Sequence, residues 1–455
     1  MITLLAITGL GVLCLLFEIF NLRRFIVPFA TIGLLAALGL TISTYDVPSS
    51  YFNNMVITDN FSVVFSSLFI LLTTFLVAMS HEFYRDHPTK ISDFVSIKIF
   101  LLAGAVAMVT FGNLAMFFLG LEVLSIALYI LASSERLSLK SNEAGMKYFL
   151  MGAFASGIVL FGICLIYGAT GSFEITEIYA LSTSGLMPAW FFIGMALLTI
   201  GMLFKIAAVP FHFWAPDVYE GSPNLTAALM STLTKVVAIA ALYKLITGME
   251  SIVDYKFQIL IVIISIASMV VGNIMALRQD NVKRMLAFSG VSHAGFMLMV
   301  FLSNSPSHGT LLYYAGAYAL AGIAAFAVLI HVCEGKDNEN IVNFNGLGKT
   351  NPFLAAMLTA ALLSMGGIPI FSGFFAKFML FTQTIQSGYL YVVIVAVLMS
   401  IVSIGYYFKL ILAMYTKDAE ESSRPVPMIY SAVAGIAILI NVLMGLFPSA
   451  IIDLL

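Results

Sequence analysis

The chain has 455 residues, of which 61% are hydrophobic and only 10% are charged, and its formal net charge is −2. Soluble domains are about 45–50% apolar and about 25% charged, so this chain is too apolar for a surface that faces water. The composition excludes a soluble enzyme, a disordered chain and a disulfide scaffold. It argues against a nucleic-acid binder, because no run of cations is longer than a pair such as Arg23–Arg24. A chain embedded in lipid is therefore predicted.

Long apolar runs, hydrophobic on all sides, follow one another along the whole chain, as membrane-spanning helices do. In chain order, fourteen spans are predicted, at 2–21, 25–43, 61–80, 96–112, 114–133, 147–168, 188–211, 226–247, 257–277, 285–303, 310–332, 352–386, 389–414 and 428–449. Only Gly112 and Asn113 separate the fourth from the fifth. No soluble domain interrupts them, so residues 1–455 are expected to form one all-α polytopic membrane domain.

The positions of Lys and Arg predict the orientation. The first cation, Arg23, follows the first apolar run, whereas a cleaved signal peptide carries its cations before that run. If the N-terminus is outside, the cytoplasmic loops hold fifteen cations, Lys98 and Lys283 among them, and the outer loops hold only Lys256. Such an excess marks the cytoplasmic side. Both termini are therefore expected on the outer, periplasmic side of a bacterial inner membrane.

Seven charged residues remain inside the predicted spans, although a charge at the bilayer centre costs about 2.5–3.5 kcal/mol on insertion scales. Three of them lie near span ends, where a partner or interfacial water is within reach: Glu18, Lys244 and Lys409. The other four lie nearer mid-span: Glu122, Lys205, Lys235 and Lys377.

A structural ion pair explains Glu122 with one lysine and leaves two lysines without an acid at that depth. Because desolvation disfavours the charged form of a buried lysine, such a set can also load and release protons as its pairing changes. We therefore interpret the four residues as proton-transfer groups. His293, inside the tenth span, is a candidate relay, with a hydrogen-bonded structural histidine as the alternative.

Two spans contain a proline where a helix interior is expected. Pro210 lies in the seventh span, and Pro369 lies in the twelfth beside Gly366 and Gly367. In lipid, a broken backbone is tolerated only against protein or a water-filled cavity. We expect both breaks to mark a hydrated path, with a simple kink as the alternative.

The breaks indicate an internal repeat. Residues 91–250 would form a first five-helix unit, spans 4–8, and residues 251–416 a second unit, spans 9–13, with the broken helix fourth in each. An odd number of spans inverts the second unit relative to the first. Residues 1–90 would add spans 1–3, and residues 417–455 would add span 14. The lysines do not superpose, because aligning the two prolines places Lys205 opposite Ser364.

Four segments carry a resemblance to a known family: FLGLEVLSIALYIL, EAGMKYFLMGAFASGIVLFGICLIYGATGS, FKIAAVPFHFWAPDVYEGSP and ALRQDNVKRMLAFSGVSHAGFML. They resemble the antiporter-like membrane subunits of respiratory complex I, and within that family subunit N of the NADH-quinone oxidoreductase. The resemblance covers about residues 90–415. It implies that the glutamate of span 5 and the lysines of spans 7, 8 and 12 form a proton path. These fall on Glu122, Lys205, Lys235 and Lys377.

The resemblance also implies what lies outside the chain. No flavin, haem or iron–sulfur motif is present, and Cys14, Cys164 and Cys333 are too far apart in sequence for a CxxC metal site or a disulfide framework. No cofactor or metal is therefore expected in this chain, and NADH, FMN, iron–sulfur clusters and quinone would bind other subunits. The expected partners are the other complex I membrane subunits, including neighbouring antiporter-like ones, and membrane lipid, with no nucleic acid.

Two alternatives stay open at this point. One is the same fold in a cation/proton antiporter complex or a membrane-bound hydrogenase. The other is an unrelated solute transporter that works alone. Copurifying subunits would distinguish them.

Overall fold

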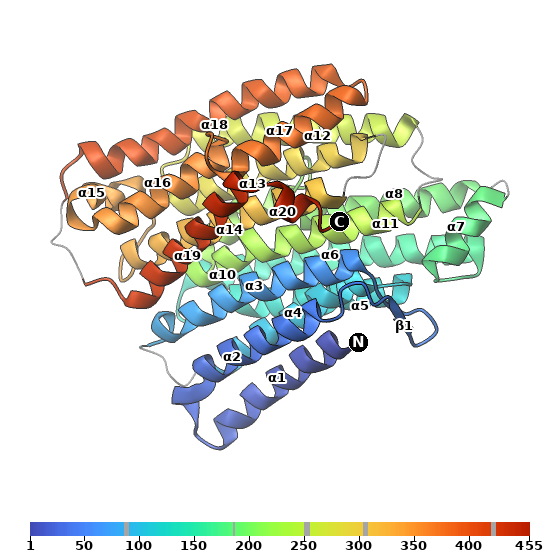
Figure 1. Cartoon of the computed structure of the whole chain (residues 1–455), viewed down its shortest axis with the longest axis horizontal. Helices are drawn as coiled ribbons and strands as arrows, with labels where there is room; N and C mark the ends of the chain where they lie inside the picture. The colour runs from blue at the N-terminus through green and yellow to red at the C-terminus, as the bar shows by residue number, and fades with distance from the viewer. Residues whose placement is uncertain (86–90, 185–186, 250–254, 304–307, 420–424) are drawn as a thin grey trace.

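The computed structural model describes residues 1–85, 91–184, 187–249, 255–303, 308–419 and 425–455. Within these ranges twelve helical stretches are long and apolar enough to cross a membrane, and they run roughly along a common direction (Figure 1). They are α1 (Ile2–Ile19), α2 (Arg23–Ile42), α3 (Asn60–Phe83), α4 (Ile91–Thr110), α5 (Leu114–Ala132), α6 (Leu139–Thr170), the stretch Asn224–Thr247, α12 (Tyr255–Leu277), α13 (Val282–Leu298) with η4 (Met299–Leu302), α14 (His308–Val332), α18 (Leu390–Thr416) and α19 (Met428–Leu446).

Two further spans are each divided into two helices, as the prolines predict. The seventh consists of α8 (Ala189–Lys205) and α9 (Trp214–Gly221), and the twelfth of α16 (Pro352–Gly366) and α17 (Ser372–Gln386). Their first halves are apolar but short. With these two, the described chain has the fourteen predicted spans.

The eighth span is continuous but irregular. It passes from α10 (Asn224–Leu229) through one π-helical stretch, η2 (Met230–Thr234), into α11 (Lys235–Thr247). A π-helical turn rotates the side chains that follow it relative to a regular α-helix. Lys235 is the first residue after this stretch, so the irregularity lies next to a predicted functional lysine.

Several short elements were not predicted. An antiparallel hairpin pairs β1 (Ser49–Tyr51) with β2 (Val56–Thr58). Other short elements are α7 (Ile175–Ser184), η5 (Ile341–Phe344), α15 (Leu347–Thr350) and α20 (Ser449–Ile452). They lie between spans or at the end of the chain, where hydropathy carries no signal about local structure.

The two five-helix units pack in the same way, which confirms the predicted repeat. In the first unit α4 packs on α5, α6 packs on both halves of the broken span, and α4 also contacts α11. In the second unit α12 packs on α13, α14 packs on both halves, and α12 also contacts α18. Because each unit has five spans, the second is inverted relative to the first.

Local details repeat as well. A Cβ on Gly104 would lie 2.8 Å from the Leu124 nitrogen, and a Cβ on Gly272 would lie 2.6 Å from the Ser292 nitrogen, so each glycine permits close contact of the first two helices. Gly272 lies 168 residues after Gly104 (272 less 104), and Ser292 lies 168 residues after Leu124 (292 less 124). The same offset relates Asn113, the N-cap of α5, to Asn281, the N-cap of α13. Residues of α5 and α13 can therefore be compared position by position.

The three charges near span ends all have protein partners, although Lys244 and Lys409 were expected to reach interfacial water. Glu18 pairs with Arg23. Lys244 lies 3.3 Å from an Asp59 oxygen and donates to the Val109 carbonyl at 2.7 Å. Lys409 lies 2.8 Å from Asp280 and donates to the Gln279 carbonyl.

Two of the cations counted in the cytoplasmic loops are instead buried inside helices. Lys98 lies inside α4, is fully buried, and donates to the Ser80 hydroxyl at 2.7 Å. Lys283 lies in α13, is 2% exposed, and contacts Glu339 at 2.9 Å and the Ser222 carbonyl at 3.0 Å. Lys98 also falls within the predicted fourth span, 96–112, so it did not belong with the loop cations, whereas α13 begins at Val282, before the predicted start of the tenth span. Two other cations assigned to these loops, Lys90 and Arg424, lie outside the described residues.

Candidate functional site

The first unit brings Glu122 and Lys205 to one place. Lys205 is the last residue of α8 and is 4% exposed. Its ammonium donates to the Ser125 hydroxyl at 2.7 Å and lies 3.2 Å from the Tyr129 hydroxyl oxygen. Ser125 is three residues after Glu122 on α5, so the two side chains share a helix face. The lysine is held by hydroxyl groups beside the carboxylate.

No direct ion pair joins the two charges in the described structure. Glu122 is partly buried, and its Oε1 atom has no hydrogen-bond partner within the described residues. The pair therefore differs from a salt bridge, because the Lys205 ammonium binds the Ser125 and Tyr129 hydroxyls instead of the carboxylate.

Behind Lys205 the backbone turns sharply. Ala207 has a φ of +58° and the Val209–Pro210 peptide bond is cis. The Val209 N–H donates to the Ser268 hydroxyl of α12 at 2.9 Å, and the Trp214 indole donates to the Phe204 carbonyl at 3.0 Å. Pro210 is exposed beside an apolar cavity of about 560 Å³. Protein groups therefore bind the freed backbone at these two points.

Lys235 is the least connected of the four. It is 1% exposed, and its ammonium has no hydrogen-bond partner in the part of the chain that the structure describes. The ammonium lies directly over Gly290 of α13, where an added Cβ would be 2.3 Å away. A buried cation with no partner destabilises the fold, and release of its proton or binding of a water molecule relieves this.

His293 and Lys377 face one small cavity in the second unit. The cavity measures about 10 Å³ and is also lined by Tyr314, Ser364 and other residues. A space of this size holds about one water molecule. His293 is 5% exposed, its Nδ1 lies 2.9 Å from the Tyr314 hydroxyl, and its Nε2 lies 3.4 Å from that of Tyr407. Both ring nitrogens thus have hydroxyl neighbours.

Lys377 is bound by a backbone carbonyl at the second helix break, between α16 and α17. Its ammonium donates at 3.1 Å to the carbonyl of Gly366, the last residue of α16, and lies 5.0 Å from the centre of the Phe296 ring. The carbonyl ends of a helix carry partial negative charge, so they stabilise a cation in place of a carboxylate. Gly367, with a φ of +85°, makes the turn that exposes this helix end. Pro369 follows it and is exposed.

The structure thus forms two groups from the predicted residues. Glu122 and Lys205 lie together around Ser125 and Tyr129. Lys377 shares a small cavity with His293, and the Lys235 ammonium lies over Gly290, three residues before His293 on α13. The surrounding tyrosines were missed, because a tyrosine in a membrane helix has no sequence signal that separates a path residue from a core residue.

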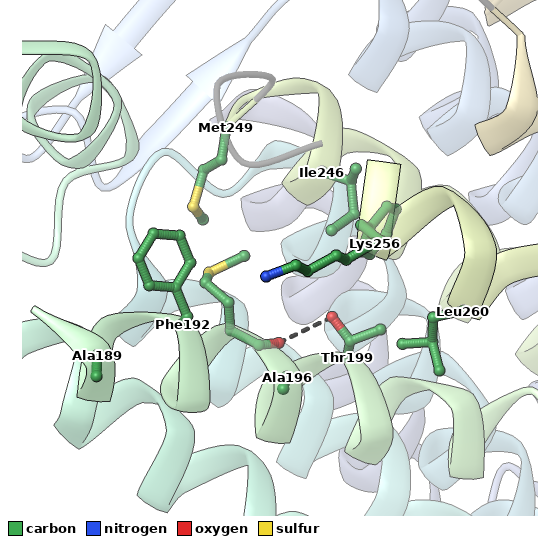
Figure 2. Close-up of a pocket in the computed structure, with 10 residues that line it drawn as sticks. Ala189, Phe192, Ala196, Thr199, Ile246, Met249, Lys256 and Leu260 are labelled. Atoms are coloured by element: carbon green, nitrogen blue, oxygen red, sulfur yellow. Dashed lines mark hydrogen bonds between the residues drawn. The ribbon is translucent and has the colours of Figure 1, made fainter. Parts of the chain in front are cut away.

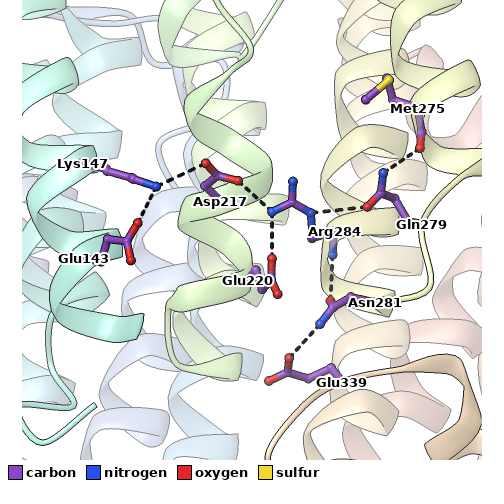
Figure 3. Close-up of polar contacts among 9 residues, drawn as sticks. All are labelled: Glu143, Lys147, Asp217, Glu220, Met275, Gln279, Asn281, Arg284 and Glu339. Atoms are coloured by element: carbon purple, nitrogen blue, oxygen red, sulfur yellow. Dashed lines mark hydrogen bonds and ion pairs between the residues drawn. The ribbon is translucent and has the colours of Figure 1, made fainter. Parts of the chain in front are cut away.

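Ion pairs join the two units at the predicted cytoplasmic side (Figure 3). Arg284 of α13 contacts Asp217 at 2.7 Å and Glu220 at 2.8 Å, both on α9. Lys147 of α6 contacts Asp217 at 3.4 Å and Glu143 at 2.6 Å. The second half of the broken span is therefore tied to the helix that carries His293.

An apolar cavity of about 460 Å³ lies between α8, α11 and α12, with the Lys256 side chain extended into it (Figure 2). Phe192, Ile246 and Leu260 are among its lining residues. None of the four mid-span charged residues lines it. This cavity is separate from the charged groups.

Comparisons with known proteins agree with one another. The family described as NADH:quinone oxidoreductase/Mrp antiporter membrane subunits matches residues 112–403. NADH-quinone oxidoreductase subunit N of Flavobacterium johnsoniae is 66% identical over 460 residues, which cover 100% of this chain and 99% of that protein.

Solved structures have the same fold. A chain of respiratory complex I from Thermus thermophilus is 30% identical with a TM-score of 0.87, and the match covers 99% of this chain and 98% of that chain. A chain of the Mrp complex from Dietzia sp. is 21% identical with a TM-score of 0.83, covering 100% and 96%. The second likeness concerns the fold alone.

Proposed function

The chain belongs to the family of NADH-quinone oxidoreductase subunit N, and from this premise we propose that Glu122, Lys205, Lys235, His293 and Lys377 carry protons through it. It is a multi-pass subunit of complex I, a translocase of the bacterial membrane, and it assembles with other membrane subunits, neighbouring antiporter-like ones among them. The translocase activity belongs to the whole complex.

We place NADH oxidation and quinone reduction, with the FMN and iron–sulfur clusters that they require, in other subunits. The three cysteines lie in or beside separate helices, α1, α6 and α14, so their positions do not suit shared ligation of a cluster. No group of three or more His, Cys, Asp or Glu side chains in the described residues is arranged to hold a metal ion. Proton transfer driven by the rest of the complex is the chemistry that suits this chain.

One observation carries the proposal for the site. Three lysines and one histidine, from four different helices, are each between 1% and 5% exposed, and Lys235 has no partner among the described residues. A structural role predicts partners for every buried charge, because an unpaired one destabilises the fold. A role in proton transfer predicts lysines that are bound only by uncharged groups or water. The groups found around these lysines are hydroxyls, a backbone carbonyl and a cavity of the size of one water molecule.

In this mechanism a proton on Lys205 is stabilised by Glu122 and bound by Ser125 and Tyr129. When the carboxylate moves away, desolvation favours release of the proton towards Lys235. Lys235 then passes it through the second unit to Lys377, beside the helix end at Gly366. We propose the outlet on the Lys377 side, reached along the outward half of the twelfth span.

Removal of the Lys205 charge tests the first step. We expect Lys205→Ala to lower proton pumping by the assembled complex on the order of tenfold or more, because the group that receives the proton is lost. Glu122→Gln should have the same direction of effect. Pumping is measured in proteoliposomes with NADH and quinone, and normalised to the amount of subunit assembled.

The matched control is Lys409→Ala, which removes a lysine from the rim of the second unit, where its partner is Asp280. It should leave pumping nearly unchanged. If Lys205→Ala pumps as well as Lys409→Ala, Lys205 has no part in the path.

Lys377→Arg tests the last step. Arginine keeps the positive charge but does not release its proton, so the complex should assemble while pumping falls sharply. Lys409→Arg is the control. Full pumping in Lys377→Arg would mean that Lys377 is only a structural charge and that the outlet lies elsewhere.

We also propose that both termini lie on the outer side, because the cytoplasmic loops then hold almost all of the loop cations. In a chain without other cysteines, Arg278→Cys and Thr176→Cys should react with a membrane-impermeant thiol reagent from opposite sides. Both positions are exposed. Labelling of Thr176→Cys from the cytoplasmic side, or of both from one side, would contradict this orientation.

A further inference from the structure

The proposed path has a gap between Lys235 and His293, for which no direct hydrogen bond is found within the described residues. The hydroxyl of Tyr318, on α14, lies in this region. An added Cβ at Gly290 would lie 2.3 Å from the Lys235 nitrogen and 2.9 Å from the Tyr318 oxygen. The two atoms are therefore at most 5.2 Å apart, the sum of those distances. That spacing, without a direct bond, suits one bridging water.

Tyr318 also reaches the other side of the gap. Its ring centre lies 4.7 Å from that of His293, and its side chain lines the small cavity shared by His293 and Lys377. The side chain is 4% exposed, and its hydroxyl has Ser231 as a neighbour at 3.4 Å. Its hydroxyl thus lies close to the Lys235 ammonium, and the same side chain lines the cavity that His293 and Lys377 share.

Gly290 allows the Lys235 ammonium and the Tyr318 hydroxyl to approach each other, because it has no side chain. It lies three residues before His293 on α13, hence on the same helix face. By the offset of 168 it occupies the position that Glu122 has on α5. The first unit places a carboxylate there, whereas the second has no side chain and leaves space for an ammonium from the neighbouring unit.

We propose that the Tyr318 hydroxyl, in the space that Gly290 leaves, relays protons between Lys235 and the cavity at His293 and Lys377. This inference rests on the proposed function. In one transfer the Lys235 ammonium loses a proton through a water to the Tyr318 oxygen. The tyrosine O–H bond breaks as the new one forms, and the released proton passes to His293 or to the Lys377 amine. Tyr318 ends unchanged, and one proton has moved.

Tyr318→Phe removes only the hydroxyl, and Tyr313→Phe is its matched control. Tyr313 lies on the same helix, is fully buried, and donates to the Met444 carbonyl at 2.8 Å, away from the lysines. We expect Tyr318→Phe to lower proton pumping of the complex several-fold and to raise its solvent deuterium isotope effect, because proton transfer becomes rate-limiting. Tyr313→Phe should change neither. Equal pumping and equal isotope effects in the two variants would overturn the inference.

Gly290→Ala is a second, independent variant. The new methyl group would meet the flexible end of Lys235 and the Tyr318 hydroxyl rather than backbone, so the helix can still pack. It should reproduce the defect of Tyr318→Phe, and the double variant should be little worse than either single variant, because both act on one step. Gly157→Ala, on α6 with nothing within 4 Å, is the control and should be neutral. Normal pumping in Gly290→Ala would contradict the role of this space.

Lys235→Ala separates the two proposals. If it abolishes pumping while Tyr318→Phe does not, only the relay through Tyr318 is wrong. If both variants pump normally, the path through Lys235 itself is wrong.

Discussion

A positive charge in the hydrocarbon core must be bound, hydrated or released, and this constraint decides how the interior of the chain is built. Lys98 has a hydroxyl, Lys283 has a carboxylate, and Lys377 has the carbonyl end of a broken helix. Lys205 has two hydroxyls beside a carboxylate. Only Lys235, of these five, has no partner in the described structure. The proposed proton path depends on these differences in partners, since a lysine held by a permanent salt bridge would keep its proton.

The two units repeat the same backbone but have different residues at equivalent positions. The glycine contacts and N-caps of α5 and α13 correspond at a constant offset, and so do Ser125 and His293. Ser125 binds the lysine of the first break, and His293 shares a cavity with the lysine of the second. At the position of Glu122 the second unit has Gly290. The backbone thus repeats between the two units while the charged residues on it differ.

The broken helices serve this arrangement in different ways. At Val209 the freed donor binds Ser268 in the other unit, so the break helps to join the units. At Gly366 the freed carbonyl binds Lys377. The ion pairs of Arg284 with Asp217 and Glu220 add a second connection between the same units. A displacement of α9 would therefore also displace α13, the helix that contains both Gly290 and His293.

Hydropathy predicted the fourteen spans because each helix in lipid must be apolar along about 20 residues, and the prolines predicted the breaks because they remove backbone donors. The loop count misplaced Lys98 and Lys283, because a lysine near the polar end of a helix looks like a loop residue in a single sequence. No signal in the sequence marked Tyr318. Which helices meet, and which hydroxyl faces which lysine, is decided by packing that a single sequence does not display.

The central claim is that water and hydroxyl groups, not ion pairs, connect Lys235 of the first unit to Lys377 of the second. A density map of the assembled complex with ordered waters visible tests it most directly. The account predicts a water between Lys235 and Tyr318 and another in the cavity between His293 and Lys377. A direct ion pair between Lys235 or Lys377 and a carboxylate, with apolar side chains filling these two places, would contradict it.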